Sequence, residues 1–271
     1  MKSRNDELRE IINEKKFFIV DGDGTLYSWD KPKIGSKKFL EYLGLNGKRF
    51  IILSNNDSMS HANRIERLTE ILDIPIHFEN LVIPNDLVIN YLRKLQIRRF
   101  DGLITNDFVD ELIDNGFEFD KENPEIVIIG FDTELTYDKL SRNIGHINTN
   151  IKFILTHTDV MCPYINGKEI PDVGIIYAMI EKATNKKPVK LFGKPYKDTL
   201  IYTLSKNKHS KKETIIIGDR LLTDIKMANE NNIDSIWLYN NEENLTLLKT
   251  SIFKPTYIAE SLESINKAIL G

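Results

Sequence analysis

Polar residues that can bind a metal ion or a phosphate group follow several apolar, strand-like segments of this sequence. They are Asp21 and Asp23, Ser54 and Asn55, Lys194, and Asp219 with Asp224. In an open parallel sheet, functional side chains converge at the carboxyl ends of the strands. We therefore expect these residues, although far apart in the chain, to meet at one edge of a sheet.

The chemistry that these side chains offer together is phosphoryl transfer. Crowded carboxylates repel one another unless a cation lies among them, and oxygen ligands beside a phosphate favour Mg²⁺. The Lys194 ammonium group and the donors of Ser54 and Asn55 suit phosphate oxygens. Phosphoryl transfer requires a metal that neutralises charge and fixed donors for the equatorial oxygens.

Each cluster also has a plainer structural interpretation. Residues 21–25 have the composition of a tight turn, whereas a calcium loop is excluded because the glycine comes too early. Residues 54–56 are typical of a loop and helix cap, and Lys194 alone is typical of a surface lysine. Asp219 and Asp224 would stabilise the start of a helix. Their occurrence together, each beside a strand end, favours the functional interpretation.

The hydrophobic pattern indicates which elements position these residues. Short apolar runs, such as residues 17–20, 126–129 and 215–217, alternate with amphipathic, helix-like segments. This alternation predicts βα units and an α/β fold with a mainly parallel sheet. One of the helices is expected to begin after its cap Ser58 and to carry Leu68 on its apolar face.

Composition places the chain among ordinary globular proteins of one or two domains. It has 271 residues, 41% of them hydrophobic, and a formal net charge of −3. Such a charge gives no broad electropositive surface, so neither nucleic acid nor a membrane is expected as a partner. A single cysteine, Cys162, excludes an intrachain disulfide and fits a reducing compartment. Because we find no signal-peptide pattern or bilayer-length apolar run, the expected location is the cytoplasm.

Four short motifs resemble the signatures of the haloacid dehalogenase (HAD) superfamily of phosphatases. Residues 17–26 (FFIVDGDGTL) are similar to the first signature and residues 217–224 (IGDRLLTD) to the fourth. Residues 53–56 are similar to the second signature and residues 193–195 to the third. The insert between the second and third signatures resembles the C2-type cap of the NagD and p-nitrophenylphosphatase-like subfamily. The resemblance covers nearly the whole chain but is dense only at the signatures.

The resemblance implies a fold and a division into domains. It implies a Rossmann-like α/β core, with a parallel sheet flanked by helices, built from residues 1–96 and 188–271. Residues 97–187 would then form an inserted α/β cap domain of the C2 type. Because caps of this type often form dimer contacts in relatives, a homodimer through the cap is a further expectation.

The resemblance also implies a role for each acidic signature residue. Asp21 would be the nucleophile and a metal ligand, and Asp23 the general acid and base, with its backbone carbonyl on the metal. Asp219 would be a further ligand of the Mg²⁺ ion, and Asp224 would support the metal through water or hydrogen bonds. Attack by Asp21 on phosphorus would form an aspartyl-phosphate, which water activated by Asp23 then hydrolyses.

Phosphate binding falls to the second and third signatures in this resemblance. Ser54 and Asn55 would bind phosphate oxygens, and Lys194 would steady both the nucleophile and the phosphate. The acid Asp23, two residues after Asp21, is what separates a phosphatase from the dehalogenase branch of the same superfamily. The sequence therefore favours hydrolysis of a phosphate ester.

Two segments of the insert depart from the pattern of the subfamily. Relatives often read Pro-Gly-x-Gly where this chain has residues 171–174 (PDVG), and Asn-x-Asp where it has residues 157–159 (HTD). We therefore take His157, Asp159 and Asp172 as candidates for substrate specificity. His157 is expected to be a structural or solvent-facing histidine rather than a catalyst.

The leading hypothesis is a Mg²⁺-dependent phosphatase that hydrolyses the phosphate monoester of a small cytosolic metabolite. Sugar phosphates, glycerol phosphates, phosphoglycolate, nucleotides and pyridoxal phosphate all remain open, because resemblance in fold does not fix the substrate. One alternative is a phosphomutase or phosphotransferase, which passes the phosphoryl group to an acceptor other than water. Another is a catalytically silent module that binds a phosphorylated ligand, against which the intact pair Asp21 and Asp23 argues.

Overall fold

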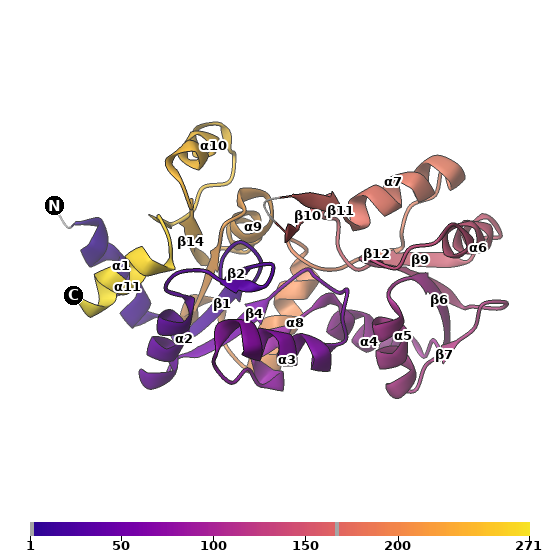
Figure 1. The fold of residues 1–271 in the computed structure, drawn as a ribbon, viewed down its shortest axis with the longest axis horizontal. Coiled ribbons are helices and arrows are strands. Elements are labelled where there is room, and N and C mark those ends of the chain that lie inside the picture. The colour runs from indigo at the N-terminus through magenta and orange to yellow at the C-terminus, as the bar shows by residue number, and fades with distance from the viewer. Residues whose placement is uncertain (1–2, 166–167) are drawn as a thin grey trace. The chain divides into compact units, whose positions relative to one another are not determined.

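The computed structural model describes residues 3–165 and 168–271, and the described chain falls into two compact units. The first unit comprises Met1–Ser54, Ile65–Val82 and Leu200–Gly271, and the second comprises Asn55–Arg64 and Ile83–Thr199. Figure 1 labels the helices and strands of both units. None of the helices that the described residues form is long and apolar enough to cross a lipid bilayer.

Within the described residues, the first unit is built on a six-stranded sheet in the order β15-β14-β13-β1-β4-β5. Its strands are β1 (Phe17–Asp21), β4 (Arg49–Leu53), β5 (Leu81–Val82), β13 (Thr214–Gly218), β14 (Asp234–Leu238) and β15 (Tyr257–Ala259). Each neighbouring pair is parallel. The central strands β1 and β13 are buried along their whole length, as is usual for a parallel sheet covered by helices. The predicted α/β fold with a parallel sheet is confirmed.

The register of the central strands brings their carboxyl ends to one edge of the sheet. Asp21, the last residue of β1, pairs with Leu53, the last residue of β4. On the other side of β1, Val20 pairs with Ile217, which lies one residue before the end of β13. The polar residues that follow these three strands therefore begin at the same edge, as the sequence predicts.

Helices and short turns complete the first unit. They are α1 (Arg4–Glu14), α2 (Ser36–Leu45), α9 (Lys226–Asn231), α10 (Leu245–Thr250), α11 (Leu262–Leu270), the 3₁₀ turns η1 (Phe78–Asn80), η3 (Lys211–Glu213) and η5 (Glu242–Asn244), the π-helical turn η4 (Leu221–Ile225), and the hairpin of β2 (Tyr27–Ser28) and β3 (Lys31–Pro32). The helices α3 (His61–Leu72) and α8 (Lys197–Asn207) contain residues of both units. Helices α1 and α11 lie side by side (Figure 1), and the Arg9 guanidinium donates to the Ala268 carbonyl at 2.8 Å.

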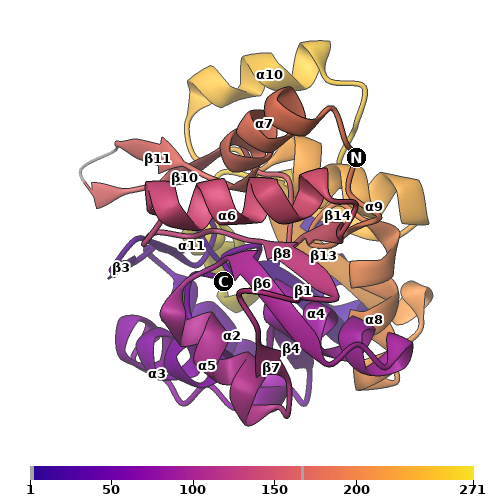
Figure 2. The ribbon, with the colours of Figure 1, turned by 90° about the vertical axis from the view of Figure 1, so that its right-hand side faces the viewer.

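In the part of the second unit that the structure describes, a five-stranded parallel sheet has the order β12-β9-β8-β6-β7. Its strands are β6 (Arg99–Leu103), β7 (Glu118–Phe119), β8 (Ile126–Ile129), β9 (Lys152–Leu155) and β12 (Lys190–Leu191). The strands β10 (Met161–Pro163) and β11 (Glu169–Pro171) form a separate antiparallel hairpin. The helices are α4 (Pro84–Leu95), α5 (Asn106–Asp114), α6 (Tyr137–Asn148) and α7 (Val173–Thr184). Helices α6 and α7 cover one face of the five-stranded sheet and α4 and α5 the other (Figures 1 and 2).

The core of the second unit includes the space between its sheet and the helices α6 and α7. Val127 and Ile129 of β8 pack there with Phe153 of β9, Ile147 of α6 and Ile176 of α7, all of them buried. Burial of one such side chain contributes about 1.5–3 kcal/mol. The apolar run that predicted a strand at residues 126–129 thus forms β8 and fixes the helices that cover it.

Helix α3 begins later than the sequence predicts. Its first residue is His61, so the expected cap Ser58 lies outside the helix. Ser60 caps the helix instead, because its Oγ accepts from the backbone nitrogen of Asn63 at 3.3 Å, and two carboxylates of α5 bind the neighbouring backbone donors. Asp107 accepts from the backbone nitrogen of Ser60 at 2.7 Å, and Glu111 accepts from that of His61 at 2.9 Å. The predicted cap is therefore wrong by two residues, and the two carboxylates beside the true cap come from a helix more than forty residues further on, which the local sequence does not reveal.

Candidate active site

Three carboxylates of the first unit come together at the carboxyl edge of its sheet. Asp21 ends β1, Asp219 follows β13 directly, and Asp224 lies in the turn η4. One oxygen atom of each side chain lies within 4.8 Å of the other two. Asp21 and Asp224 are buried, and Asp219 is half-buried. The structure therefore brings together three of the acidic residues that the sequence predicts to meet.

Two glycines make this close approach sterically possible. Gly24 has a φ of +90°, and a Cβ atom at this position would overlap the Asp219 carboxylate. A Cβ atom at Gly218 would overlap the carboxyl group of Asp224 in the same way. Glycine fits both positions because it has no Cβ atom, and at Gly24 it also adopts the positive φ without strain. The Trp237 indole donates to the backbone carbonyl of Asp219 at 2.8 Å and holds the loop that follows β13.

Alanine in place of Gly24 is expected to destabilise the chain by at least about 2 kcal/mol, because backbone strain adds to the steric overlap. Gly47→Ala isolates the strain, since Gly47 has a φ of +66° and open surroundings, and it should cost about 1–2 kcal/mol. Gly44→Ala, inside α2 with nothing within 4 Å, should be neutral or stabilising. Urea unfolding of the three variants measures this order. Equal losses at Gly24 and Gly47 would contradict a steric conflict with Asp219.

Asp23 lies in the turn that leaves β1, two residues beyond Asp21. The Tyr27 hydroxyl donates to Asp23 Oδ2 at 3.1 Å. The backbone nitrogen of Leu26 donates to the Gly22 carbonyl at 2.8 Å and closes the turn. The segment is thus the tight turn that its composition indicates. Asp23 in this turn is half-buried and follows Asp21, a member of the carboxylate cluster, by two residues.

The donor set of this cluster fits a hard divalent cation. Asp21, Asp219 and Asp224 offer oxygen atoms alone. Three carboxylate oxygens within 4.8 Å of one another repel unless positive charge lies among them. Mg²⁺ and Ca²⁺ prefer oxygen ligands, whereas zinc and copper favour nitrogen and sulfur. The residues present therefore fit the magnesium ion that the family resemblance implies.

Ser54 belongs to the first unit and follows β4 directly. Its backbone nitrogen donates to the Val82 carbonyl at 3.2 Å, which continues the ladder between β4 and β5. The residue is buried. Because β4 is the neighbour of β1 in the sheet, Ser54 lies at the same edge as Asp21.

In the second unit, Asn55 and Lys194 are joined by a reciprocal pair of hydrogen bonds. The backbone nitrogen of Lys194 donates to Asn55 Oδ1 at 2.6 Å, and Asn55 Nδ2 donates to the Lys194 carbonyl at 3.1 Å. Asn55 Nδ2 also donates to Asp159 Oδ2 at 3.2 Å. Lys194 is only 4% exposed, which excludes the surface-lysine interpretation of this residue. These three predicted site residues of the second unit thus lie together.

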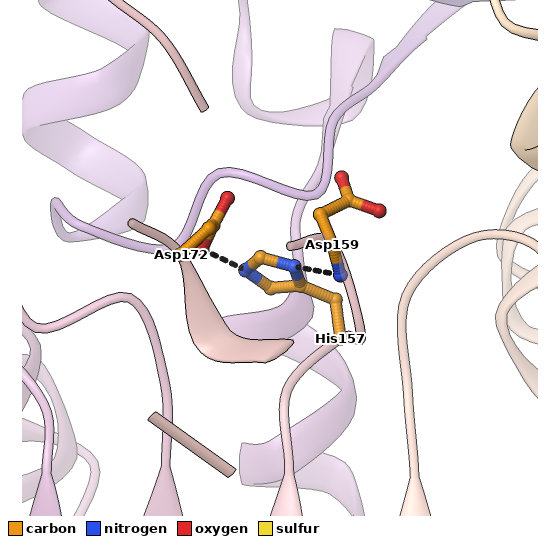
Figure 3. A group of neighbouring side chains, drawn as sticks. All are labelled: His157, Asp159 and Asp172. Carbon is orange, nitrogen blue, oxygen red and sulfur yellow. Dashed lines mark hydrogen bonds and ion pairs between the residues drawn. The ribbon is translucent and has the colours of Figure 1, made fainter. Parts of the chain in front are cut away.

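The specificity candidates His157, Asp159 and Asp172 also come together, as Figure 3 shows. His157 Nε2 lies 3.5 Å from Asp172 Oδ1 and 3.3 Å from Asp57 Oδ1. The backbone nitrogen of Asp159 donates to His157 Nδ1 at 3.4 Å. The imidazole is fully buried, so the solvent-facing alternative for His157 is excluded. Burial lowers the pKa of His157, but the charges of Asp172 and Asp57 outweigh burial and raise the pKa to about 9.

This second cluster is not arranged to bind a metal through its histidine. An imidazole that binds a metal ligates through one ring nitrogen and donates a hydrogen from the other. His157 Nδ1 instead accepts from the backbone nitrogen of Asp159, which places the hydrogen of the neutral ring on Nε2. That hydrogen faces Asp57 and Asp172, so Nε2 has no lone pair directed at these carboxylates. The imidazole therefore serves as the ion-pair partner of these two carboxylates.

The sequence did not single out two buried charged residues of the segment around the start of α3. Asp57 is 1% exposed and lies beside His157. Arg64 is 3% exposed and donates to Asn56 Oδ1 at 2.5 Å and to Ser58 Oγ at 3.2 Å. Charged residues are rarely buried unless they are paired, so hydrophobic periodicity does not mark such positions. The signal in the sequence is their position near the second signature motif: Asp57 follows residues 53–56 directly, and Arg64 comes eight residues after them.

An open parallel sheet with an all-oxygen acidic cluster at its carboxyl edge defines a Rossmann-like α/β protein with a site for a hard cation. Comparison with known proteins specifies the class further. A family model described as haloacid dehalogenase-like hydrolase matches residues 18–118, and one described as HAD-hydrolase-like matches residues 191–265.

Individual relatives match over nearly the whole chain. A solved 4-nitrophenylphosphatase from Thermotoga maritima is 30% identical, covers 96% of this chain and 99% of its own, and has a TM-score of 0.88. A solved putative NagD protein is 28% identical over 95% of this chain and 99% of its own, with a TM-score of 0.85. The acid sugar phosphatase of Staphylococcus aureus is 26% identical over 95% of this chain and 98% of its own. The chain belongs to the haloacid dehalogenase-like hydrolases, as a phosphatase of the NagD-like group.

Proposed function

We propose that this chain hydrolyses the phosphate monoester of a small metabolite through an aspartyl-phosphate on Asp21. The observation that carries the proposal is the acidic cluster, in which an oxygen of the buried Asp21 lies within 4.8 Å of oxygens of Asp219 and Asp224. Asp23, two residues further on, adds the acid that phosphate-ester hydrolysis needs. Relatives named for 4-nitrophenyl phosphate and for acid sugar phosphates support a small substrate.

The proposed reaction has two steps, and Asp21 and Asp23 carry them. A carboxylate oxygen of Asp21 attacks phosphorus in line, the bond from phosphorus to the ester oxygen breaks, and the Asp23 carboxyl group protonates the departing alcohol. The Asp23 carboxylate then takes a proton from water, which attacks the phosphorus of the aspartyl-phosphate. This second step releases inorganic phosphate and restores both side chains. The hydrogen bond from the Tyr27 hydroxyl orients Asp23 for this proton transfer.

We assign Asp21, Asp219 and the backbone carbonyl of Asp23 to direct binding of Mg²⁺. When bound, the ion offsets the negative charge of the carboxylates and of the phosphoryl oxygens. Asp224 is 1% exposed, and its Oδ2 accepts from the backbone nitrogen of Arg220 at 3.3 Å. This bond fixes the orientation of Asp224, which suits a residue that supports the ligands of the ion from behind.

Ser54, Asn55 and Lys194 are assigned to the phosphate group. The Lys194 ammonium offsets charge on the phosphoryl oxygens, and the Ser54 hydroxyl is a donor to one of them. The Asn55 side chain has its Oδ1 and both hydrogens of Nδ2 engaged with Lys194 and Asp159. Its part in phosphate binding is therefore to hold the backbone of Lys194 in place.

We extend the proposal to the insert at residues 97–187, which we assign as the C2-type cap. The five-stranded sheet and its helices support this assignment, because they form the body of a compact unit of their own. A cap of this type favours small phosphorylated metabolites over folded phosphoproteins as substrates. The nature of the metabolite is the question that a substrate panel answers.

Phosphate release from a panel of small phosphorylated metabolites tests the proposed function. We expect release in the presence of Mg²⁺ to fall by about 10²-fold or more when EDTA removes the ion, and to return when Mg²⁺ is added back. Sugar phosphates, glycerol phosphate, phosphoglycolate, nucleotides and pyridoxal phosphate make up the panel, with 4-nitrophenyl phosphate as a general substrate. Transfer to an added alcohol without release of phosphate would show a phosphotransferase instead. Binding without turnover of any substrate would show a silent module.

A further inference from the structure

The geometry points to His157 as a positioning residue that fixes the pair Asn55 and Lys194 through contacts with Asp57 and Gly193. The inference rests on the proposed function for the part that concerns phosphate, since that function assigns Lys194 to the substrate. The contacts themselves all lie within the second unit. His157 lies between Asp159 and Asp172, as Figure 3 shows, and its Nε2 atom is also 3.3 Å from Asp57 Oδ1.

The first link runs from His157 to the segment that carries Asn55. Asp57 lies two residues after Asn55, and its Oδ1 atom is 3.3 Å from His157 Nε2. The same oxygen accepts from the backbone nitrogen of Phe131, just beyond β8, at 3.1 Å. A Cβ atom at Gly130 would overlap the Asp57 carboxylate, so the surrounding backbone encloses this side chain closely. The imidazole and the end of β8 therefore hold the Asn55 segment from two sides.

The second link runs from His157 to Lys194 through the glycine that precedes it. A Cβ atom at Gly193 would lie 2.6 Å from the Cβ atom of His157 and 2.7 Å from Asn55 Oδ1. The backbone of Gly193 is therefore seated directly on both residues, and its φ of +74° favours glycine. This contact is made by the Cβ atom of His157, so it seats Gly193 beside Asn55 without the ring. The imidazole itself acts on Lys194 through Asp57 and the Asn55 segment, because Asn55 Oδ1 accepts from the backbone nitrogen of Lys194.

A third contact holds the imidazole itself in place. Asp172 precedes α7, and its Oδ1 atom accepts from the backbone nitrogen of Val173 at 2.7 Å while lying 3.5 Å from His157 Nε2. The N-terminus of α7 thus fixes the orientation of this carboxylate, and the carboxylate in turn fixes the ring. A buried carboxylate that loses its ion-pair partner keeps the cost of desolvation without compensation, so removal of the imidazole disturbs both Asp172 and Asp57.

The charges that face the imidazole from the packed segments are those of Asp57, Asp159 and Asp172. Burial lowers the pKa of His157, but these carboxylates raise it above the ordinary value of 6.5 to about 9. Burial also raises the pKa of Asp172 to about 6. Protonation of Nδ1 gives up the long bond from the Asp159 backbone nitrogen, and the attraction of three carboxylates outweighs that loss. Between about pH 6 and pH 9 the ring is therefore charged and Asp172 is ionised.

The sign of the pH effect follows from these values. The pKa of His157 is raised in the folded chain, so its contribution to folding is complete below the ordinary value of 6.5 and is lost as the pH rises through about 9. As the pH rises through about 9, the ion pair between His157 and Asp57 is lost, and the positions of Asn55 and Lys194 become less fixed. We therefore expect the KM of the wild-type chain to be level at neutral pH and to rise above about pH 9.

The variant His157→Gln tests the inference by two independent measurements, with the exposed His77→Gln as the matched control. The first is hydrogen exchange at the backbone amide of Lys194, which needs no catalytic activity. We expect exchange to become about tenfold faster or more in His157→Gln and to stay unchanged in His77→Gln. The second is steady-state kinetics with Mg²⁺, where KM should rise by about tenfold or more and kcat should change less. The rise of KM near pH 9 should also disappear.

A second variant guards against a folding defect of the first. Asp57→Asn keeps the shape of the side chain and removes one of the charges that raise the pKa of His157. The pH at which KM rises should therefore move below about 9, while far-ultraviolet circular dichroism stays that of the wild type. Unchanged Lys194 exchange in a folded His157→Gln variant would overturn the inference. Faster Lys194 exchange in His157→Gln, together with a wild-type chain that releases no phosphate, would leave the inference standing and remove the proposed function.

Discussion

The variant Asp21→Asn is expected to release phosphate at least about 10³-fold more slowly than the wild-type chain at saturating Mg²⁺. The amide of asparagine cannot attack phosphorus, and the substitution also removes one of three carboxylates that lie within 4.8 Å of one another. Side-chain size is nearly unchanged, so the all-buried strand β1 should keep its packing. Steady-state release of phosphate from the best substrate of the panel measures the effect.

The control for Asp21→Asn is Asp110→Asn, which makes the same chemical change at an exposed position of α5. It should retain wild-type activity and unfold at the wild-type urea concentration. Chemical trapping adds a direct test, because wild-type chain quenched in acid during turnover should carry phosphate on Asp21. Activity of Asp21→Asn within tenfold of wild type would exclude this residue as the nucleophile.

The variant Asp23→Asn is expected to act differently on substrates with different leaving groups. An alkoxide leaving group needs a proton, so release from an alkyl phosphate such as glycerol phosphate should fall by about 10²–10⁴-fold. The 4-nitrophenolate ion is stable without a proton, so the first step with 4-nitrophenyl phosphate should be much less affected. The second step still lacks its base. We therefore expect a burst of one equivalent of nitrophenolate, followed by slow turnover.

The matched variant for Asp23→Asn is Tyr27→Phe, which removes the hydroxyl that donates to Asp23 Oδ2 at 3.1 Å. It leaves the acid in place and should lower turnover by about tenfold or less, with no burst. Stopped-flow absorbance of nitrophenolate resolves the two phases. Equal losses of Asp23→Asn on both substrates, with no burst, would contradict a double role of Asp23 as acid and base.

The part of the site that the sequence predicts well consists of side chains whose placement follows from the chain direction of a strand. The apolar run before Asp21 forms β1, and the run before Asp219 forms β13, so their polar successors necessarily emerge at the same sheet edge. Asp224 meets them because the turn η4 starts three residues before it. For such residues, apolar patterning and the parallel arrangement of strands are sufficient information.

The part that the sequence could not predict depends on contacts between distant segments. The burial of His157 requires Asp57, a residue one hundred positions earlier, and neither has a pattern that points to the other. Arg64 lies on a helix whose apolar positions are recognisable, yet its guanidinium turns back to Asn56 and Ser58. Partners from distant segments allow a charged side chain to be buried away from water. The hydrophobic periodicity of the sequence does not indicate which residues have such partners.

The division into units shows the same limit at the level of domains. Ser54 and Asn55 are consecutive in the chain, but the first belongs to one compact unit and the second to the other. Residues 55–64 belong to the second unit, where Asp107 and Glu111 of α5 accept from the backbone of Ser60 and His61. The predicted insert at residues 97–187 lies wholly within that unit, which also takes in segments on either side of it. Contacts of this kind between distant segments do not show in the local composition of the sequence.

The order of strands in the two sheets has a consequence for how the chain behaves at high concentration. Among the described strands of the six-stranded and five-stranded sheets, those at the margins are the shortest: β5, β7 and β12 have two residues each and β15 has three. An exposed strand margin recruits strands of other chains through its unpaired backbone groups. Edge strands of two or three residues present few consecutive unpaired backbone groups. The folded chain is therefore a poor template for intermolecular β-pairing, and resistance to aggregation is built into the strand order that also gathers its acidic residues.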